Sequence, residues 1–161
     1  MAINRGKQFE TVVKDCFQKV PHTAVVRLHD QTTGFVGSSN ICDFIVYHYP
    51  NQYFIECKSV HGNTLPFSNI TDNQWQGMLE MSKIHGVWAG VVCWWCDHDV
   101  TKFIPIDTLE AMRKADCKSV RYDLQQYIAD RFIYSIYNIE GKKKRIFFDY
   151  DMDKFFKDVR G

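Results

Sequence analysis

The sequence predicts an α/β fold in which a mixed central β-sheet is flanked by helices. Three observations support this fold class: an amphipathic helical pattern opens the chain, β-rich runs and a second capped helix follow it, and residues 87–95 are almost continuously apolar. A run of that kind is typical of a strand that is covered on both faces. Because the chain has 161 residues, we expect a single domain over residues 1–161.

The first helix is predicted from Asn4 to Val20, where apolar residues recur every three or four positions. Glu10 lies at the edge of the apolar face, whereas Arg5 and Lys7 lie away from it. Two interpretations of Glu10 stay open. The side chain reaches solvent, or it stands beside a metal site as an outer ligand or as a residue that holds water.

A strand, a loop and a hairpin are predicted next. Residues Thr23–His29 alternate between apolar and polar, and Asp30–Asn40 are rich in Gly, Ser and Thr. The segment Ile41–Lys58 contains two apolar β-rich runs joined by Tyr49-Pro50-Asn51-Gln52. A proline between two such runs is typical of a turn, so we predict a β-hairpin here.

The register of this hairpin determines which side chains meet. If Tyr49 and Gln52 close a two-residue connection, Asp43 lies opposite Lys58, and Glu56 points to the same face as both. A three-residue loop would reverse the parity and separate the three side chains. The expected cluster of Asp43, Glu56 and Lys58 therefore depends on the length of the turn.

The pattern D-x(12)-E-x-K formed by these three residues resembles the site of PD-(D/E)xK nucleases. Two carboxylates on paired strands are close enough to bind one small cation, and Mg²⁺ prefers oxygen ligands together with water. A neighbouring lysine could orient the attacking water or stabilise the charge on a phosphodiester. The alternative is structural: Glu56 and Lys58 form a surface ion pair and Asp43 is a turn residue.

The second helix is predicted over Thr71–His85, after a connector at Ser59–Ile70. Thr71 and Gln74 have the spacing of a capping box, and Gly86 follows the last turn. Two interpretations of Gln74 stay open. Its amide completes the cap, or it hydrogen-bonds a water or phosphate at the site.

Strands and helices also alternate in the predicted C-terminal half. We predict strands at 87–95 and 102–106, a helix at 107–114, a pair of strands at 131–138 and 145–150 around Glu140-Gly141, and a helix at 151–159. A basic run occupies the turn of the last strand pair, where it is either a solvated loop or a phosphate contact. The run consists of Lys142, Lys143, Lys144 and Arg145.

Composition excludes several protein classes. No apolar run is long enough to span a membrane and residues 1–7 lack a signal-peptide core, so we expect a cytoplasmic protein without a membrane partner. The net charge of +1 does not indicate nucleic-acid binding by itself. The six cysteines suit reduced core thiols. Cys93, Cys96 and His98 form either a zinc site without a second ligand pair or the end of a buried strand.

Four motifs follow one another in a characteristic order. They are Asn4-Arg5-Gly6 with Glu10, the Asp43, Glu56 and Lys58 set, the segment Thr64–Ile70, and Gln74 at the start of a helix. Their order and spacing resemble the RecU-type Holliday junction resolvases of the restriction-endonuclease-like superfamily. The resemblance extends to the apolar strand that ends at Trp95, and the remainder of the chain matches in general plan alone.

The resemblance implies a Mg²⁺- or Mn²⁺-dependent endonuclease that acts as a homodimer and nicks two opposed strands of a four-way DNA junction. It assigns the metal to Asp43 and Glu56, the catalytic lysine to Lys58, and accessory catalytic roles to Glu10 and Gln74. DNA contacts would come from Arg5, Lys7 and the basic run. The bacterial cytoplasm or a phage-infected host would be its setting.

One departure concerns junction selectivity. Family members have a long stalk between the first two strands and a longer basic N-terminal extension, whereas this chain has only Asp30–Asn40 at the stalk position. A compact version encoded by a phage or a bacterium is our expectation. The alternatives are another PD-(D/E)xK nuclease that cuts duplex or flapped DNA, and a DNA-binding protein without catalysis.

Overall fold

The apolar stretch at 87–95 forms β5 (Val87–Trp95), a central strand of a six-stranded sheet. The computed structural model describes residues 4–29 and 40–160. The sheet has the order β1-β2-β3-β5-β6-β10, and within it only β3 and β5 are parallel. Its other strands are β1 (Thr23–Arg27), β2 (Phe44–His48), β3 (Asn51–Val60), β6 (Val100–Pro105) and β10 (Tyr137–Asn138).

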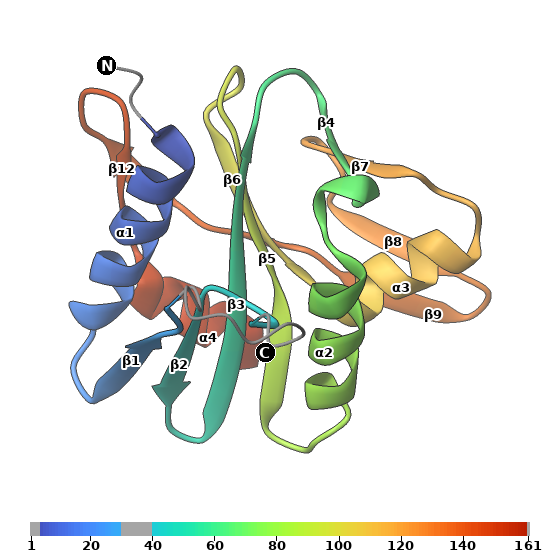
Figure 1. Cartoon of the computed structure of the whole chain (residues 1–161), viewed down its shortest axis with the longest axis horizontal. Coiled ribbons are helices and arrows are strands. Elements are labelled where there is room, and N and C mark those ends of the chain that lie inside the picture. Colours follow the sequence, from blue (N-terminus) through green and yellow to red (C-terminus); the bar gives the residue numbers. More distant parts are fainter. Residues whose placement is uncertain (1–3, 30–39, 161) are drawn as a thin grey trace, which may run out of the picture.

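Helices cover both faces of this sheet (Figure 1). Side chains alternate along β5, so that Val92 and Trp94 pack in one core and Val91 and Cys93 in the other. The first core is shared with α1 (Arg5–Gln18) and α4 (Met152–Arg160), and the second with α2 (Asp72–Ser82) and α3 (Ile106–Lys114). The predicted α/β architecture with a mixed, helix-flanked sheet is confirmed. No helix in the described parts of the chain is long and apolar enough to cross a membrane.

The hairpin of β2 and β3 forms with a register two residues away from the predicted one. His48 pairs with Asn51 and Phe44 with Ile55, so the connection is Tyr49-Pro50, joined by a cis peptide bond. The prediction started the turn one residue too late on both strands. Because the error is even, every side chain keeps its predicted face.

The predicted connector at 59–70 is wrong in part. β3 continues to Val60, and β4 (Thr64–Pro66) pairs with β7 (Ser119–Arg121), followed by a 3₁₀ turn at Phe67–Asn69. Leu65 and Val120 are fully buried on the α2 and α3 side. Strands of three residues are too short to produce a readable alternation, and their partners are distant in the sequence.

The predicted pairing of 131–138 with 145–150 is also wrong. Instead, β8 (Gln126–Ala129) pairs with β9 (Phe132–Ser135), β10 joins the main sheet beside β6, and β11 (Gly141–Lys143) pairs with β12 (Phe148–Tyr150). Asp130 adopts a φ of 54°, a left-handed conformation that suits a tight turn and that Asp tolerates. This turn redirects the chain before the predicted strand begins.

Candidate active site

The site lies where β2 separates from β3. Their last pair is Phe44 with Ile55, and β3 continues past it without a β2 partner. Asp43 fills the gap: its amide donates to the Ile55 carbonyl at 3.0 Å, and its carboxylate Oδ2 accepts the Cys57 amide at 2.7 Å. The Asp43 side chain thus takes the place of a backbone carbonyl as the acceptor for the next β3 amide, that of Cys57. Asp43 is held beside Glu56, the residue level with it in the register.

Glu56 is a buried carboxylate with an incomplete set of partners. Only 4% of its side chain is exposed. Oε2 accepts hydrogen bonds from Gln74 Nε2 at 3.0 Å and from Lys58 Nζ at 3.1 Å, whereas Oε1 is buried and has no hydrogen-bond partner among the described residues. Burial raises the pKa of Glu56, and the charge of Lys58 opposes this effect. A buried acceptor without a partner is costly and suits a cation ligand.

The carboxylate of Asp43 also has a raised pKa. Burial raises the pKa of Asp43 to about 7, the negative charge of Glu56 adds to this, and the Cys57 N–H opposes it. Two adjacent carboxylates in a poorly solvated site resist being ionised together. A divalent cation between them would relieve the repulsion.

The donor set fits Mg²⁺ or Mn²⁺. Asp43 and Glu56 offer hard carboxylate oxygens, and Mg²⁺ in proteins commonly takes one or two carboxylates and keeps several waters. Over residues 4–29 and 40–160 no group of three or more His, Cys, Asp or Glu side chains is arranged as a metal site. The pair of Asp43 and Glu56 is a donor set that suits Mg²⁺ and is poor for a structural zinc site.

Glu10 lies near this pair and is bound by an arginine. Its Oε1 is 2.9 Å from Arg27 Nη2, and its side chain is 14% exposed. The charge of Glu10 also raises the pKa of Glu56, which indicates that the two carboxylates are neighbours. Sequence reasoning did not select Arg27. The sequence position could have indicated it, because Arg27 ends the strand that directly precedes the segment leading to Asp43.

Gln74 satisfies both of its sequence interpretations at once. Its Oε1 accepts the Thr71 amide at 3.1 Å, completing the capping box that begins α2, while its Nε2 donates to Glu56. A primary amide has a separate acceptor and donor, so the two roles are compatible. The helix start therefore positions a hydrogen-bond donor on the buried carboxylate.

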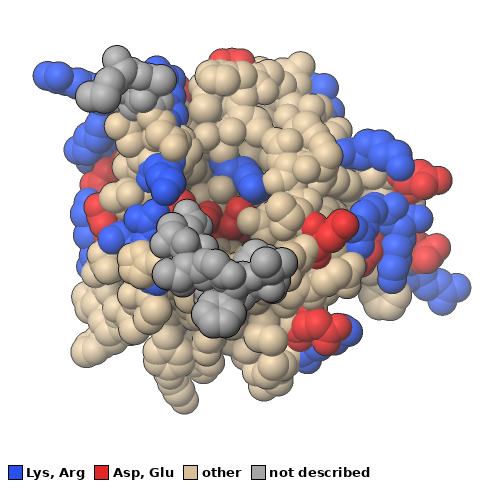
Figure 2. All heavy atoms as spheres, in the orientation of Figure 1, with Lys and Arg blue, Asp and Glu red and all other residues tan. Residues whose placement is uncertain are grey.

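Figure 2 shows this part of the surface as a hollow between α1 and α2, with acidic atoms at its floor and Lys and Arg side chains on both sides. Lys58, with 21% of its side chain exposed, belongs to the same neighbourhood. The arrangement combines an anionic floor that suits a cation with a cationic rim that suits phosphate. The structure thus brings Asp43, Glu56, Lys58, Gln74 and Glu10 together.

The predicted basic run, residues 142–145, lies apart from the carboxylates. β12 packs along α1, where Tyr150 contacts Phe9 and Asp149 binds Lys19 at 2.9 Å, so the basic run lies across α1 from the hollow (Figure 1). Within the run, Lys143 is paired with Asp99. Arg5 and Lys7 are exposed in the first turns of α1.

The positions of Cys93, Cys96 and His98 decide the expectation of a zinc site. Cys93 is fully buried at the end of β5, whereas the ring of His98 stacks on Tyr122 with centroids 3.6 Å apart, so these side chains and Cys96 do not converge as zinc ligands. The end of a buried strand is what the chain has here. The stalk position, residues 30–39, lies outside the described residues.

Comparisons with known proteins bear on the fold. No protein-family model matches the sequence. No curated protein matches it in sequence either. Among solved structures the chain is similar to Archaeoglobus fulgidus Hjc, described as a Holliday junction resolvase from an archaeal hyperthermophile. The TM-score is 0.51 at 19% identity, over 72% of this chain and 86% of that one. The chain therefore shares the α/β fold of that resolvase.

Proposed function

We propose that this protein is a metal-dependent DNA endonuclease that resolves four-way junctions by symmetric paired nicks, in the manner of RecU-type resolvases. The observation that carries the proposal is the cluster of Asp43, Glu56 and Lys58, in which a buried Glu56 oxygen has no hydrogen-bond partner within residues 4–29 and 40–160. The similarity of the fold to a Holliday junction resolvase supports the same choice. The site supports nuclease chemistry, and the similarity of the fold supports junction specificity.

Asp43 and Glu56 would hold a Mg²⁺ or Mn²⁺ ion. When bound, such an ion lowers the pKa of a coordinated water and neutralises charge that develops on a phosphodiester. Gln74 and Lys58 hold Oε2 of Glu56, which leaves Oε1 available as a ligand. Glu10, held by Arg27, would position water at the edge of the site.

Lys58 would act on the phosphate itself. In hydrolysis, a bond forms between the water oxygen and phosphorus, the bond from phosphorus to a sugar oxygen breaks, and the leaving oxygen takes up a proton. Negative charge on the phosphate increases on the way to the transition state. A lysine ammonium at this position stabilises that charge more than it stabilises the bound substrate, so it accelerates cleavage more than it strengthens binding.

The basic run is expected to contribute to DNA affinity. Changing Lys142, Lys143 and Lys144 to Ala should weaken binding and flatten its dependence on salt, because each phosphate contact releases about one counterion. Since Lys143 is already paired with Asp99, the slope of log K against log salt should fall by about two. Fluorescence anisotropy across a salt series measures this slope. An unchanged slope would place the DNA elsewhere on the protein.

The proposed function is tested with a labelled immobile four-way junction and its matching linear duplex, each with Mg²⁺ or EDTA. We expect paired nicks in opposed arms of the junction, and neither cleavage in EDTA nor cleavage of the duplex. Metal-dependent cutting of both substrates, or of a flapped duplex, would favour a repair- or restriction-type PD-(D/E)xK nuclease. No cutting of any substrate, with DNA binding retained, would indicate a DNA-binding protein without catalysis.

A further inference from the structure

Arg27 lies at the edge of the acidic hollow, one strand position away from the level of the carboxylates. It ends β1 and pairs with Phe44, which pairs with Ile55 of β3. The next residue, Leu28, donates its amide to the Asp43 carbonyl at 2.9 Å. The backbone at Arg27 is therefore held in the sheet, about 10 Å from β3 at the usual spacing of two strands.

The side chain of Arg27 reaches the hollow from the α1 face of the sheet. Directly paired residues share a face, and Phe44 packs in the core shared with α1, where Arg27 meets Glu10. Lys58 lies with Glu56 on the opposite face, the one that α2 covers. Lys and Arg side chains are visible on both sides of the hollow in Figure 2. Arg27 and Lys58 therefore approach the acidic floor from two sides.

The guanidinium of Arg27 is bound less completely than that of Arg113, which is also paired with a glutamate. Arg113 donates from Nη2 to both oxygens of Glu110 and lies 4.0 Å from the centre of the Trp75 ring. Arg27 contacts Glu10 through Nη2 at 2.9 Å, and within residues 4–29 and 40–160 its Nε and Nη1 have no hydrogen-bond acceptor. A guanidinium presents two edges, each with two parallel N–H groups. The contact with Glu10 therefore leaves one complete edge for a phosphate.

Solvent reaches the arginine side of this ion pair more than the glutamate side. The side chain of Arg27 is 32% exposed and that of Glu10 is 14% exposed. A partly buried pair of this kind contributes little net stability, because the cost of desolvation offsets the attraction between the charges. The pair is therefore better suited to orient a guanidinium toward a ligand than to stabilise the fold.

We infer that Arg27 binds a backbone phosphate of the DNA strand that enters the hollow, and that Glu10 orients its guanidinium. This inference rests on the proposed function, and it assigns a DNA contact to a residue outside the sequence motifs. The carboxylates of Asp43 and Glu56 repel a phosphate that approaches the floor, so cations beside the floor are needed to offset this repulsion. Lys58 supplies one of these charges on the α2 side, and Arg27 supplies one on the α1 side.

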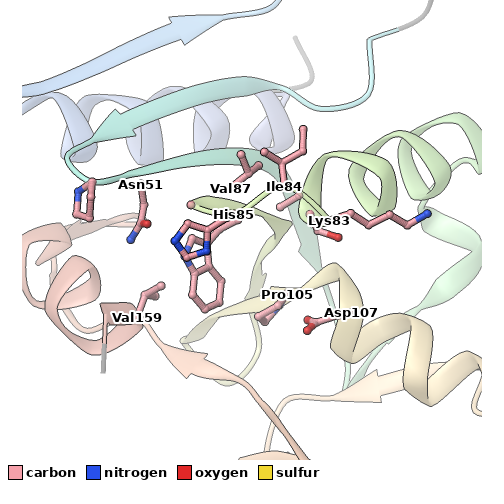
Figure 3. Close-up of a pocket in the computed structure, with 13 residues that line it drawn as sticks. Asn51, Lys83, Ile84, His85, Val87, Pro105, Asp107 and Val159 are labelled. Carbon is pink, nitrogen blue, oxygen red and sulfur yellow. The ribbon is translucent and has the colours of Figure 1, made fainter.

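A second hollow, at the other end of β3, is less suited to phosphate. It has a volume of about 650 Å³ and is bordered by the β2–β3 turn, the α2–β5 turn and the start of α3 (Figure 3). Its lining is mainly apolar, and its charged side chains are one lysine and one aspartate, Lys83 and Asp107. We therefore place the phosphate contact at Arg27 and not at this end of the sheet.

Fluorescence anisotropy of a labelled four-way junction in EDTA, across a salt series, tests the inference. Arg27→Gln should raise the DNA dissociation constant by about 10-fold or more and lower the slope of log K against log salt by about one. Arg27→Lys should keep the slope, because the charge remains, and recover part of the affinity, because an ammonium lacks the planar fork. Arg113→Gln is the matched control, since the side chain of Arg113 is 38% exposed. It should change the constant by less than about threefold.

A double variant separates a phosphate contact from simple neutralisation of Glu10. If Arg27 only neutralised Glu10, then Glu10→Gln and Arg27→Gln/Glu10→Gln would bind the junction equally well. We expect instead that the double variant binds about 10-fold more weakly than Glu10→Gln, with a slope lower by about one. Circular dichroism checks folding. If Arg27→Gln does not fold, the double variant still carries the comparison, because it removes both members of the ion pair.

Three outcomes would overturn the inference: an affinity of Arg27→Gln that matches that of Arg113→Gln, equal affinities of Glu10→Gln and the double variant, or a slope in Arg27→Lys as low as in Arg27→Gln. Binding is measured without cleavage, so the two proposals fail separately. A loss of affinity in Arg27→Gln, in a protein that cuts no DNA, would refute the nuclease and leave the phosphate contact assigned. A metal-dependent nuclease whose DNA affinity does not depend on Arg27 would do the reverse.

Discussion

Asp43→Asn is expected to abolish metal-dependent cleavage and, at the same time, to stabilise the metal-free protein at neutral pH. Loss of cleavage follows because the amide is a poor ligand for Mg²⁺ compared with a carboxylate. Stabilisation follows because the variant removes one of two adjacent buried negative charges. An amide at this position can still accept the Cys57 N–H, and its NH₂ group can donate to the orphaned Oε1 of Glu56.

The pH dependence has a definite sign. The pKa of Asp43 rises from its ordinary 3.8 to about 7 in the folded protein, so between these values the folded state binds a proton that the unfolded state has lost. The free energy of unfolding of the wild type should therefore fall as the pH rises from 4 to 7 and stay low above 7. The free energy of unfolding of Asp43→Asn should not fall in this way. Above pH 7 it should exceed that of the wild type by about 2 kcal/mol, a value that allows for solvent screening at the partly exposed side chain.

Thermal unfolding in EDTA between pH 5 and 9 measures this effect. We expect the melting temperature of Asp43→Asn to exceed that of the wild type by about 5 °C at pH 8 and to converge with it at acidic pH. Asp15→Asn is the matched control, because Asp15 is 57% exposed on α1. A variant that melts earlier than the wild type at pH 8 would contradict the predicted repulsion.

In the wild type, Mg²⁺ should reverse the loss of stability. Ion binding needs both carboxylates ionised, so Mg²⁺ should raise the melting temperature more at pH 8 than at pH 6. The same titration applied to Asp43→Asn should give almost no shift.

Lys58→Ala is expected to reduce cleavage by about 100- to 1000-fold while the DNA dissociation constant changes little. The reason is that the ammonium group acts mainly on charge that develops in the transition state. A second consequence concerns Glu56. Because the charge of Lys58 opposes the rise in the pKa of Glu56, its removal should shift the acidic limb of the pH–rate profile to higher pH.

Single-turnover cleavage of the junction at saturating Mg²⁺, with anisotropy for binding, separates the two effects. Lys157→Ala, at a lysine that is 73% exposed on α4, is the control for loss of a positive charge. Equal losses of binding and cleavage in Lys58→Ala would remove the transition-state role and make this residue a phosphate contact.

Much of the fold was predictable because it depends on local periodicity. The spacing of apolar residues in α1, the capping box at Thr71 and the apolar run of β5 each carry their own signal. The face shared by Asp43, Glu56 and Lys58 was also predictable, since side chains in a strand alternate and an even error in register leaves that face unchanged.

The β4–β7 and β8–β9 pairings were not predictable to the same degree. Short strands leave too few residues for a pattern, and packing on α2 and α3 decides which of them meet. Backbone conformation at single residues, such as the left-handed Asp130, then determines where the chain reverses.

The sequence by itself determined the fold class and the three side chains that define the candidate site, because periodicity and parity depend on neighbours along the chain. The tertiary structure alone decided how these side chains are held. It placed Arg27 on Glu10, used both ends of the Gln74 amide and, in the part of the chain that the structure describes, left one oxygen of Glu56 without a hydrogen-bond partner. Such contacts join residues from separate elements, so they depend on how the layers pack rather than on any local pattern.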